Sequence, residues 1–417
     1  MPKIKIEGGH KLSGTITVGG AKNSVVALIP AAILCDETAT ISNVPNITDV
    51  DDLEKILTHL NAKIERKTGE VIINSSEINN KEITQELSKK LRASYYFMGA
   101  LLGKFNRVEM YFPGGCAIGA RPINLHLKGF ESLGAKITEE DNHFIIEADK
   151  LKGNNIYLDF PSVGATINIM LAAVKAKGKT VIDNAAQEPE IVNVATFLNN
   201  MGAKIKGAGT STITIVGVKY LHKCYHEVIP DRIEAGTYLI IASLLGQNLK
   251  IDNMIPNHLE ALIAKLTECG VDMQIGLDNV IVNEVKKYKS TDVTTLVYPG
   301  FPTDLQQIIA TFLTQCKGKS IVEETIYENR FQNLRELNKM GAKTKVSKDN
   351  KKAIIKGVTK LKGIDVSATD LRGGASLLVA GLIAEGITTI DNIQYILRGY
   401  DEVIKKLTDV GAKIEII

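Results

Sequence analysis

One short tag closes an amphipathic segment six times along this chain. The tags are Asn61-Ala62-Lys63, Gly134-Ala135-Lys136, Gly202-Ala203-Lys204, Gly270-Val271-Asp272, Gly341-Ala342-Lys343 and Gly411-Ala412-Lys413. Their central residues follow one another at intervals of about 70 residues, so one supersecondary unit recurs six times. A chain of 417 residues is also long enough to bury two cores. Six units without a long linker therefore predict two domains of three units each.

Each unit repeats the same order of predicted elements. An apolar helix ends near a glycine, such as Gly178 or Gly318. It is followed by a β-branched strand, a second amphipathic helix that ends at the tag, and two short strands. This order predicts an α/β fold. We expect the break between halves near Ile229-Pro230, and we place residues 1–21, which contain a leftover strand, with the C-terminal half. The predicted domains are residues 22–229, and residues 1–21 with 230–417, joined by two crossings in the layout of a hinge.

One position of the repeat carries residues that suggest chemistry. About 40 residues before each tag, just before an apolar run, stand Lys22, Arg92, Gly164, Arg232, Asp304 and Arg372. The position is predicted to be the first turn of a buried helix, where free N–H groups and the helix dipole favour anions. If these ends meet, the chain builds an anion site. Asp231, Asp304 and Asp370 suggest that a group must also be deprotonated or oriented. The alternative is that the acids only cap helices and the arginines are only solvated.

Composition narrows the class of protein. Hydrophobic residues make up 44% of the chain, the mean hydropathy is +0.03 and the formal net charge is +3. This balance favours neither a nucleic-acid nor a membrane partner, while small anions need only local charge. We find no secretory signal and no apolar run long enough for a membrane span. We therefore expect a cytoplasmic protein with reduced thiols, which also fits its five cysteines.

The most unusual local segment runs from Pro113 to Pro122. Three of its residues, Gly114, Gly115 and Gly119, are glycines that permit close approach to a ligand. Cys116 lies among them, with Arg121 and Lys104 in the same unit, and a thiol beside cations and glycine N–H groups tends toward a lowered pKa. The alternative is a small apolar filler in a tight turn. Three other cysteines, Cys35, Cys269 and Cys316, are expected in the core, and no metal site is expected.

A second position repeats 11 to 15 residues before several tags. It is predicted to begin the second helix of a unit, and its charges differ in sign from unit to unit. An asymmetric site and a merely solvated helix end would both produce such variation. The residues are Arg121, Glu188 with Glu190, Glu328 with Arg330, and Arg398.

These motifs, in this order, resemble the bacterial UDP-N-acetylglucosamine enolpyruvyl transferases over essentially the whole length. The resemblance rests on Gly20-Ala21-Lys22-Asn23, Leu91-Arg92-Ala93-Ser94, Pro113 through His126, Ser162-Val163-Gly164-Ala165-Thr166, Glu188-Pro189-Glu190-Ile191, Pro230-Asp231-Arg232, Pro299-Gly300-Phe301-Pro302-Thr303-Asp304, Tyr327-Glu328-Asn329-Arg330-Phe331, Asp370-Leu371-Arg372 and Arg398-Gly399-Tyr400. It implies two inside-out α/β barrels, each of three βαβαββ units, with the active site in the cleft between them. It also implies transfer of the enolpyruvyl group of phosphoenolpyruvate to the 3'-hydroxyl of UDP-N-acetylglucosamine, the first committed step of peptidoglycan synthesis. No metal or organic cofactor is implied.

The resemblance also implies residue roles. Lys22, Arg121, Arg372 and Arg398 would neutralise phosphoenolpyruvate, Asp304 would remove the sugar hydroxyl proton, and Cys116 would act as general acid and carry a phosphoenolpyruvate adduct. The catalytic set implied is Cys116, Asp304, Lys22 and Arg398. The substrate-binding set implied is Lys22, Asn23, Arg92, Arg121, Pro122, Ile123, Asn124, Leu125, Ser162, Val163, Gly164, Asp304, Ile326, Asp370, Arg372 and Arg398.

Two other functions remain open. A shikimate-3-phosphate enolpyruvyl transferase shares fold and reaction type but lacks this cysteine loop. A non-catalytic UDP-sugar-binding paralogue would have no need to keep Lys22, Cys116, Asp304 and Arg398 together.

Overall fold

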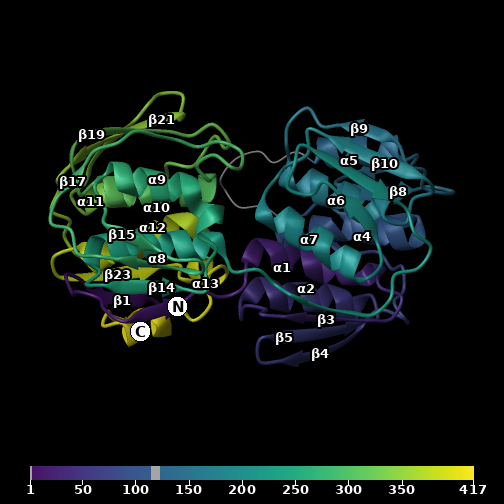
Figure 1. Cartoon of the computed structure of the whole chain (residues 1–417), viewed down its shortest axis with the longest axis horizontal. Coiled ribbons are helices and arrows are strands. Elements are labelled where there is room, and N and C mark those ends of the chain that lie inside the picture. The colour runs from purple at the N-terminus through teal and green to yellow at the C-terminus, as the bar shows by residue number, and fades with distance from the viewer. Residues whose placement is uncertain (1, 114–122) are drawn as a thin grey trace. The chain divides into compact units, whose positions relative to one another are not determined.

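The computed structural model describes residues 2–113 and 123–417, which form two compact units (Figure 1). The first unit contains residues 20–113 and 123–229. The second contains residues 2–19 and 230–417. Each unit has its own apolar core and its own three small sheets.

The first unit contains three sheets, with strand orders β13-β3-β5-β4, β11-β12-β10-β9 and β6-β8-β7. Its strands are β3 (Thr38–Ser42), β4 (Lys63–Lys67), β5 (Glu70–Asn74), β6 (Arg107–Tyr111), β7 (Lys136–Glu140), β8 (His143–Glu147), β9 (Asn155–Tyr157), β10 (Lys179–Asp183), β11 (Lys204–Lys206), β12 (Thr212–Val216) and β13 (Cys224–Glu227). Its helices are α1 (Lys22–Ala31), η1 (Ala32–Leu34), α2 (Thr48–His59), α3 (Gln85–Lys90), η2 (Arg92–Tyr95), α4 (Tyr96–Phe105), α5 (Asn124–Ser132), α6 (Val163–Ala173) and α7 (Pro189–Asn200), where η marks a 3₁₀-helix.

The second unit contains the sheets β22-β23-β1-β24, β15-β16-β14-β2 and β17-β19-β21-β20, with β18 also paired to β19. Its strands are β1 (Ile4–Glu7), β2 (Thr15–Thr17), β14 (Leu249–Asp252), β15 (Met273–Ile275), β16 (Asn279–Val282), β17 (Tyr288–Lys289), β18 (Val293–Thr294), β19 (Cys316–Glu323), β20 (Lys343–Val346), β21 (Lys352–Gly357), β22 (Asp365–Ser367), β23 (Ile387–Asp391) and β24 (Lys413–Ile416). Its helices are α8 (Arg232–Leu245), η3 (Pro256–Leu259), α9 (Glu260–Glu268), α10 (Thr303–Leu313), α11 (Asn333–Lys339), α12 (Leu371–Ile383), α13 (Gln394–Leu397) and α14 (Val403–Asp409).

One helix of each repeat is almost wholly buried, and the strands lie outside it. In α6, Ala165 to Ala173 are all buried, and so are Arg372 to Leu382 in α12. By contrast, β5 and β21 alternate buried and more exposed residues, so their sheets have one face on the core. Figure 1 shows α8, α10 and α12 enclosed by the strands of the second unit. The helices therefore form the core of each unit, and the predicted α/β class is confirmed.

Close helix packing in the first unit depends on a glycine. A Cβ added at Gly99 of α4 would lie 2.3 Å from the carbonyl oxygen of Asn168 in α6. The Gly99 N–H instead donates to Asn168 Oδ1 at 2.9 Å. Alanine at this position would force the two buried helices apart.

Two strands pair with sheets that their position in the chain does not suggest. Strand β13 precedes α8 but pairs in parallel with β3, near the start of the chain. Strand β2 precedes α1 but pairs in parallel with β14. Strand β1 lies between β23 and β24, so residues 1–21 contain two strands, β1 and β2, which join two different sheets, where the sequence predicted one leftover strand. The parallel partners of β3 and β14 are thus supplied by remote segments, whereas β9 with β10 and β22 with β23 are parallel pairs of neighbouring strands.

The six tags have a common structural cause. Their first residues all have positive φ, namely Asn61 (70°), Gly134 (93°), Gly202 (101°), Gly270 (91°), Gly341 (107°) and Gly411 (106°). Each follows the last turn of a helix, where a left-handed residue ends the helix and satisfies carbonyls. Glycine adopts this conformation without steric cost, and asparagine is the next most tolerant residue. The tag is therefore the C-terminal cap of the second helix in each unit.

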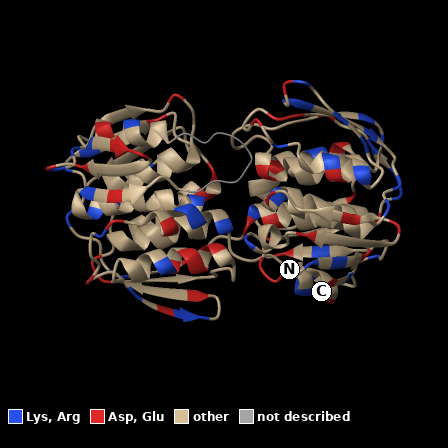
Figure 2. Cartoon of the chain, turned by 180° about the vertical axis from the view of Figure 1, so that it is seen from behind, with Lys and Arg blue, Asp and Glu red and all other residues tan. Residues whose placement is uncertain are grey.

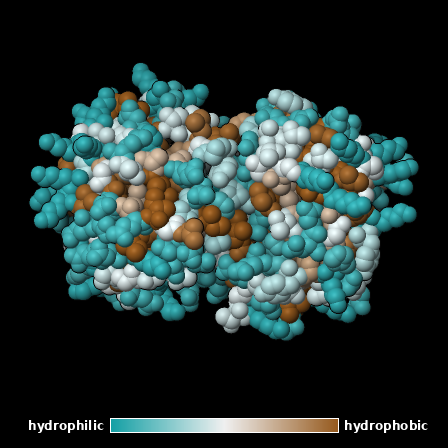
Figure 3. Space-filling model, in the orientation of Figure 1, coloured by the Kyte–Doolittle hydropathy of each residue, from teal (hydrophilic) through white to brown (hydrophobic). Residues whose placement is uncertain are grey.

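The surface carries both signs of charge. Figure 2 shows Lys and Arg intermixed with Asp and Glu in each unit. The face in Figure 3 is mostly hydrophilic, with separate apolar groups, and the most exposed large apolar residues, such as Leu277, Val358 and Tyr157, lie on different elements. Within residues 2–113 and 123–417, no helix combines the length and apolar character needed to span a bilayer.

Candidate active site

The repeated polar position lies at a helix start in all six units. Lys22 and Arg232 are the first residues of α1 and α8, while Gly164, Asp304 and Arg372 are the second residues of α6, α10 and α12. These five positions confirm the prediction of a helix first turn. The sixth, Arg92, differs, because it opens the 3₁₀-helix η2 that leads into α4. There the Ser94 N–H donates to Leu91 O at 3.1 Å, three residues back, which tightens the turn.

Side chains cap three of these helices. Asp370 Oδ1 accepts the N–H groups of Arg372 and Gly373, both at 3.0 Å. Asp231 Oδ1 caps α8 in the same way, while Ser162 Oγ accepts one N–H of α6 at 3.3 Å. Asp231 and Asp370 thus cap their helices, and their carboxylates also complement the helix dipole. Asp304 makes different contacts.

Asp304 is held by two buried guanidinium groups in the second unit. Its Oδ1 accepts from Arg330 at 2.5 Å and its Oδ2 accepts from Arg372 at 3.1 Å. The side chains of Arg330 and Arg372 are 2% and 3% exposed, whereas that of Asp304 is 27% exposed. Charge-assisted hydrogen bonds of this kind fix the plane of a carboxylate. The arrangement can hold an anionic group in a defined orientation next to buried positive charge.

Arg372 of α12 connects Asp304 of α10 to a third helix, α8. It donates to the hydroxyl of Tyr400 at 3.3 Å, and that hydroxyl lies 2.9 Å from Thr237 Oγ1 in α8. Burial alone would lower the pKa of Arg372, but the charge of Asp304, together with the smaller effects of Tyr400 and Asp231, outweighs burial, so the pKa is raised. Burial raises the pKa of Tyr400, so this phenol is a neutral partner of the guanidinium. The starts of α10 and α12 and the second turn of α8 thus meet in one polar cluster.

In the first unit, Lys22 contacts a buried acid. Its Nζ lies 2.9 Å from Asp49 Oδ2, and the side chains of Lys22 and Asp49 are 12% and 2% exposed. Asp49 belongs to the first turn of α2, where a carboxylate is favoured by the helix dipole. The ammonium group is therefore held in place by a second helix. Asn23 follows it in α1 and is half-buried.

The first unit also buries a neutral histidine. His126 Nδ1 lies 2.8 Å from Asn168 Nδ2, and its ring meets the Tyr95 ring edge-on with centroids 5.0 Å apart. Burial, with a smaller effect of the positive charge of Arg92, lowers the pKa of His126 to about 3. A Cβ at Gly164 would lie 3.0 Å from both His126 Cε1 and the Tyr95 hydroxyl, so only glycine fits here without a shift. The start of α6 is thus packed directly under two aromatic side chains.

The remaining predicted site residues are distributed as follows. Ile123 is buried before α5, while Asn124 and Leu125 open that helix, exposed and half-buried respectively. Val163 opens α6 and is half-buried. The N–H of Ile326 donates to Glu324 Oε1 at 2.8 Å. Cys116, Arg121 and Pro122 lie outside the described residues.

The second repeated position is only partly a helix start. Glu188 and Glu190 do lie at the start of α7. Arg330 instead lies in the loop before α11, and Arg398 follows the last residue of the short helix α13. In the last unit the second helix is divided into α13 and α14, so Arg398 lies at the end of a helical turn. The prediction was wrong for these two arginines.

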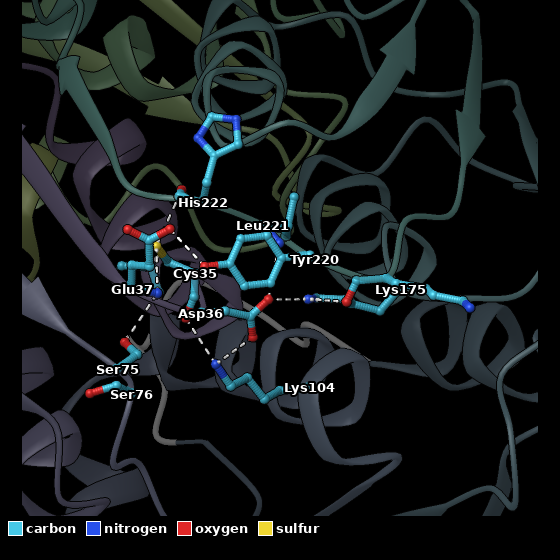
Figure 4. A network of polar contacts seen from close by, with 12 residues as sticks. Cys35, Asp36, Glu37, Ser75, Ser76, Lys104, Lys175, Tyr220, Leu221 and His222 are labelled. Atoms are coloured by element: carbon cyan, nitrogen blue, oxygen red, sulfur yellow. Dashed lines mark hydrogen bonds and ion pairs between the residues drawn. The ribbon is translucent and has the colours of Figure 1, made fainter.

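Lys104 has a partner that the sequence did not suggest. It donates to Asp36 Oδ1 at 3.3 Å and to Cys35 O at 2.8 Å, and Lys175 donates to Asp36 Oδ2 at 2.8 Å (Figure 4). Burial lowers the pKa of Lys104. It lies near the end of α4, whereas Arg92 precedes the start of that helix. Lys104 thus has a local structural role beside Asp36. The expected burial of Cys35, Cys269 and Cys316 is confirmed.

Three carboxylate and imidazole groups outside these clusters lie close enough to be considered for a metal. They are Glu82, Glu109 and His143. His143 Nε2 lies 3.4 Å from Glu109 Oε1, and Arg107 pairs with the other oxygen of Glu109 at 2.7 Å. Arg107 already supplies a cation to the carboxylate of Glu109. The cluster is therefore an ordinary surface ion pair.

Sequence reasoning missed several residues of these clusters. The only sequence signal for Asp49 was that it is an acid near a helix start. There was no sequence signal for the buried Glu324. Tyr400 and His126 stood inside quoted motifs without an assigned role. Their functions depend on contacts between remote segments, which a motif does not reveal.

Comparison with known proteins decides the family. The family model of EPSP synthase (3-phosphoshikimate 1-carboxyvinyltransferase) matches residues 6–407. The chain belongs to the EPSP synthase family. Within it, UDP-N-acetylglucosamine 1-carboxyvinyltransferase 2 of Listeria monocytogenes is 53% identical over 412 residues, covering 99% of this chain and 97% of the relative. The protein of the same name from Bacillus cereus is 51% identical over 415 residues, covering 99% and 96%. The resemblance inferred from the motifs is confirmed.

Solved structures of the EPSP synthase family share the fold. The enolpyruvyl transferase NikO from Streptomyces tendae matches with a TM-score of 0.89 at 25% identity, covering 100% of this chain and 98% of that chain. EPSP synthase from Acinetobacter baumannii matches with a TM-score of 0.76 at 18% identity, covering all of both chains. The predicted fold of inside-out α/β repeats is therefore that of the EPSP synthase family.

Proposed function

We propose that this protein transfers the enolpyruvyl group of phosphoenolpyruvate to the 3'-hydroxyl of UDP-N-acetylglucosamine and releases phosphate. The proposal places it in the cytoplasm, at the first committed step of peptidoglycan synthesis. The observation that carries it is the 53% identity, over 99% of the chain, to a relative named for this activity. We also propose that the first and second units are the two barrel domains, with bounds close to 22–229 and to 1–21 with 230–417.

The contacts of the second unit support a role for Asp304 in proton removal. Its carboxylate is oriented through both oxygens by Arg330 and Arg372 and remains 27% exposed. A base must lie within hydrogen-bond reach of the proton that it abstracts, and a fixed carboxylate satisfies this at little entropic cost. We assign Asp304 as the base for the sugar hydroxyl and Asp370 to holding the start of α12, beside the substrate.

The cations support binding of a substrate with two anionic groups. Phosphoenolpyruvate carries a phosphate and a carboxylate, which Lys22, Arg121, Arg372 and Arg398 would neutralise in this proposal. The same charges would stabilise phosphate as it leaves. Cys116 would protonate the methylene carbon and can carry the adduct. No cofactor is required for an addition and elimination of this type.

The first unit would bind most of the UDP-sugar. The start of α6 offers N–H groups near Ser162, Val163 and Gly164, as a helix N-terminus does for phosphate. In the proposal these residues act with eight others. The others are Asn23, Arg92, Arg121, Pro122, Ile123, Asn124, Leu125 and Ile326.

The rival functions are separated by one assay. Phosphate release from phosphoenolpyruvate is measured with UDP-N-acetylglucosamine and with shikimate 3-phosphate, for wild type, Cys116→Ser and the control Cys224→Ser. We expect release only with UDP-N-acetylglucosamine, strongly reduced in Cys116→Ser and unchanged in the control. Equal release with shikimate 3-phosphate would indicate the first rival. Binding of the UDP-sugar without any release would indicate the non-catalytic paralogue.

A further inference from the structure

The second unit places two thiols against each other just beneath its surface. Cys269 caps the end of α9 and Cys316 begins β19, and their side chains are hydrogen-bonded to one another. We propose that Cys269 and Cys316 form a redox-active dithiol: a hydroperoxide oxidises Cys269, and Cys316 then closes a disulfide that joins the end of α9 to the start of β19. This modification site is independent of the transfer reaction proposed above.

Strand β17 brings the two cysteines together. The N–H of Lys289 in this strand donates to Cys269 O at 2.9 Å, while its neighbour Tyr288 pairs in parallel with Cys316. The Cys316 thiol also lies 3.6 Å from Phe312 O, near the end of α10. Because its S–H can rotate, it can donate either to this carbonyl or to the sulfur of Cys269. Backbone hydrogen bonds therefore hold both cysteines at one place before any bond forms between their sulfurs.

Both thiols are buried, but each lies next to the surface. Cys269 and Cys316 are 0% exposed, whereas their neighbours Glu268, Gly270 and Lys317 are exposed. The end of a helix opens more readily than its centre, and a brief opening at the end of α9 admits a molecule as small as hydrogen peroxide. A small hydroperoxide can therefore reach the pair without unfolding of the whole unit.

The contacts of Cys269 favour it as the thiol that reacts first. Hydrogen bonding from Cys316, with a smaller contribution from the charge of Lys265, outweighs burial and the charge of Glu268, so the pKa of Cys269 is lowered. The same hydrogen bond and burial raise the pKa of Cys316. The thiolate is the nucleophilic form of cysteine. Cys269 should therefore attack the peroxide, and Cys316 should attack the product.

The reaction has two steps. In the first, the Cys269 thiolate attacks one oxygen of hydrogen peroxide and the O–O bond breaks. Hydroxide leaves and takes up the proton that the thiol released, which gives water and a Cys269 sulfenic acid. In the second, the Cys316 sulfur attacks the sulfur of the sulfenic acid, the S–O bond breaks, and hydroxide leaves with the Cys316 proton as a second water. The two sulfurs lose two electrons in total, and the peroxide gains them.

The disulfide would act as a staple within the second unit. It would close a loop of about 50 residues, and a cross-link of this span stabilises a fold mainly by restricting the unfolded chain. The loop contains α10, which carries Asp304 at its start and ends three residues before Cys316. Oxidation would therefore make the second unit more resistant to unfolding.

The other two described cysteines provide a control within the same chain. Cys35 Sγ lies 3.4 Å from His222 O and accepts from the N–H of Glu37 at 3.4 Å (Figure 4). Burial raises the pKa of Cys35, and it raises that of Cys224 to about 12. Both thiols are therefore protonated at neutral pH and react slowly with peroxide. We expect no disulfide between Cys35 and Cys224.

The test treats folded wild type with hydrogen peroxide, blocks the remaining thiols and maps the tryptic peptides by mass spectrometry without reduction. The five cysteines lie in five different tryptic peptides, so each thiol is read separately. We expect a cross-link between residues 266–286 and 290–317, with the loss of two hydrogen atoms, and dithiothreitol should reverse it. Free or separately oxidised thiols at Cys269 and Cys316 would overturn the proposal, and so would a cross-link that forms only in unfolded protein.

Serine variants test the order of the steps and the effect on stability. In Cys316→Ser we expect a sulfenic acid at Cys269 that dimedone labels, because no second thiol displaces it, whereas Cys269→Ser should give no label at Cys316. Oxidation should raise the melting temperature of wild type and of the control Cys224→Ser by about 5–10 °C, and should not raise that of Cys269→Ser. Equal labelling of the two cysteines would overturn the assigned order. The wild-type cross-link decides by itself if a serine variant does not fold.

Discussion

The two units use the same repeated helix start for different chemistry. In the second unit the position brings charges together, because Arg372 and the nearby Arg330 both donate to Asp304 and both arginines are buried. In the first unit the corresponding start of α6 is a glycine, packed under the neutral His126 and Tyr95. A helix start supplies N–H groups in both cases. The side chains placed on it therefore decide whether the unit can orient a reactive carboxylate or form a close-fitting surface.

The difference also affects stability. Buried charges of the second unit depend on each other, because removing one leaves its partner uncompensated. The buried polar groups of the first unit around α6 are neutral amides and an imidazole, whose loss costs less.

The largest effect is expected for Asp304 against its repeat counterpart Gly164. Asp304→Asn should lower kcat by about 100- to 10,000-fold, because a general base contributes that much. Gly164→Ala should mainly raise the KM for the UDP-sugar, since its Cβ would press on His126 and Tyr95 at 3.0 Å. Steady-state assays of phosphate release measure both. A larger kcat loss in Gly164→Ala than in Asp304→Asn would reverse the assignment of roles.

The next largest effect is the loss of stability when a buried charged group is removed, compared with the loss when a buried neutral group is removed. Arg372→Met should destabilise the second unit by about 3–5 kcal/mol, because Asp304 loses one of its two cations inside the protein. Asn168→Ala should destabilise the first unit by about 1–3 kcal/mol, since it removes a neutral partner of His126. Urea denaturation followed by circular dichroism compares them. Equal losses would mean that the two clusters are energetically alike.

As the pH falls, the first unit should lose stability at a higher pH than the second unit. Burial lowers the pKa of His126 to about 3 and that of His226 to about 4, from an unfolded value of 6.5. Below pH 6.5 the unfolded state binds protons that the folded state does not, so stability falls as the pH falls toward these lower values. Hydrogen exchange at pH 7 and pH 5 should show a greater loss of protection in residues 20–113 and 123–229. Greater loss in the second unit would contradict this prediction.

The smallest effect is expected at the helix caps. Asp370 accepts two backbone N–H groups at 3.0 Å and a third bond from Gln307, whereas Ser162 accepts one N–H at 3.3 Å. Asp370→Ala should therefore cost about 2 kcal/mol, and Ser162→Ala about 0.5–1 kcal/mol. Thermal melts of the two variants give the order. The reverse order would show that the bond count does not determine the strength of these caps.

The sequence predicted what local chemistry determines. A helix that ends in a left-handed residue needs glycine or asparagine there, so the six tags were visible without coordinates. The apolar runs likewise located the buried helices. In both cases the signal lies within a few residues of the structure that it predicts.

Contacts between remote segments could not be predicted in the same way. Arg330 and Arg372 are 26 and 68 residues from Asp304, and no spacing rule brings them to one carboxylate. The pairing of β13 with β3 depends on which sheet lacks a parallel strand. Asp49 becomes the partner of Lys22 only when α1 and α2 pack together.

We propose above all that this protein transfers the enolpyruvyl group of phosphoenolpyruvate to UDP-N-acetylglucosamine. The most direct measurement is NMR of the products formed from ¹³C-labelled phosphoenolpyruvate and UDP-N-acetylglucosamine. We expect an intact vinyl group bonded through oxygen to C3' of the sugar, together with free phosphate. Pyruvate and phosphate beside unchanged UDP-N-acetylglucosamine would contradict the account.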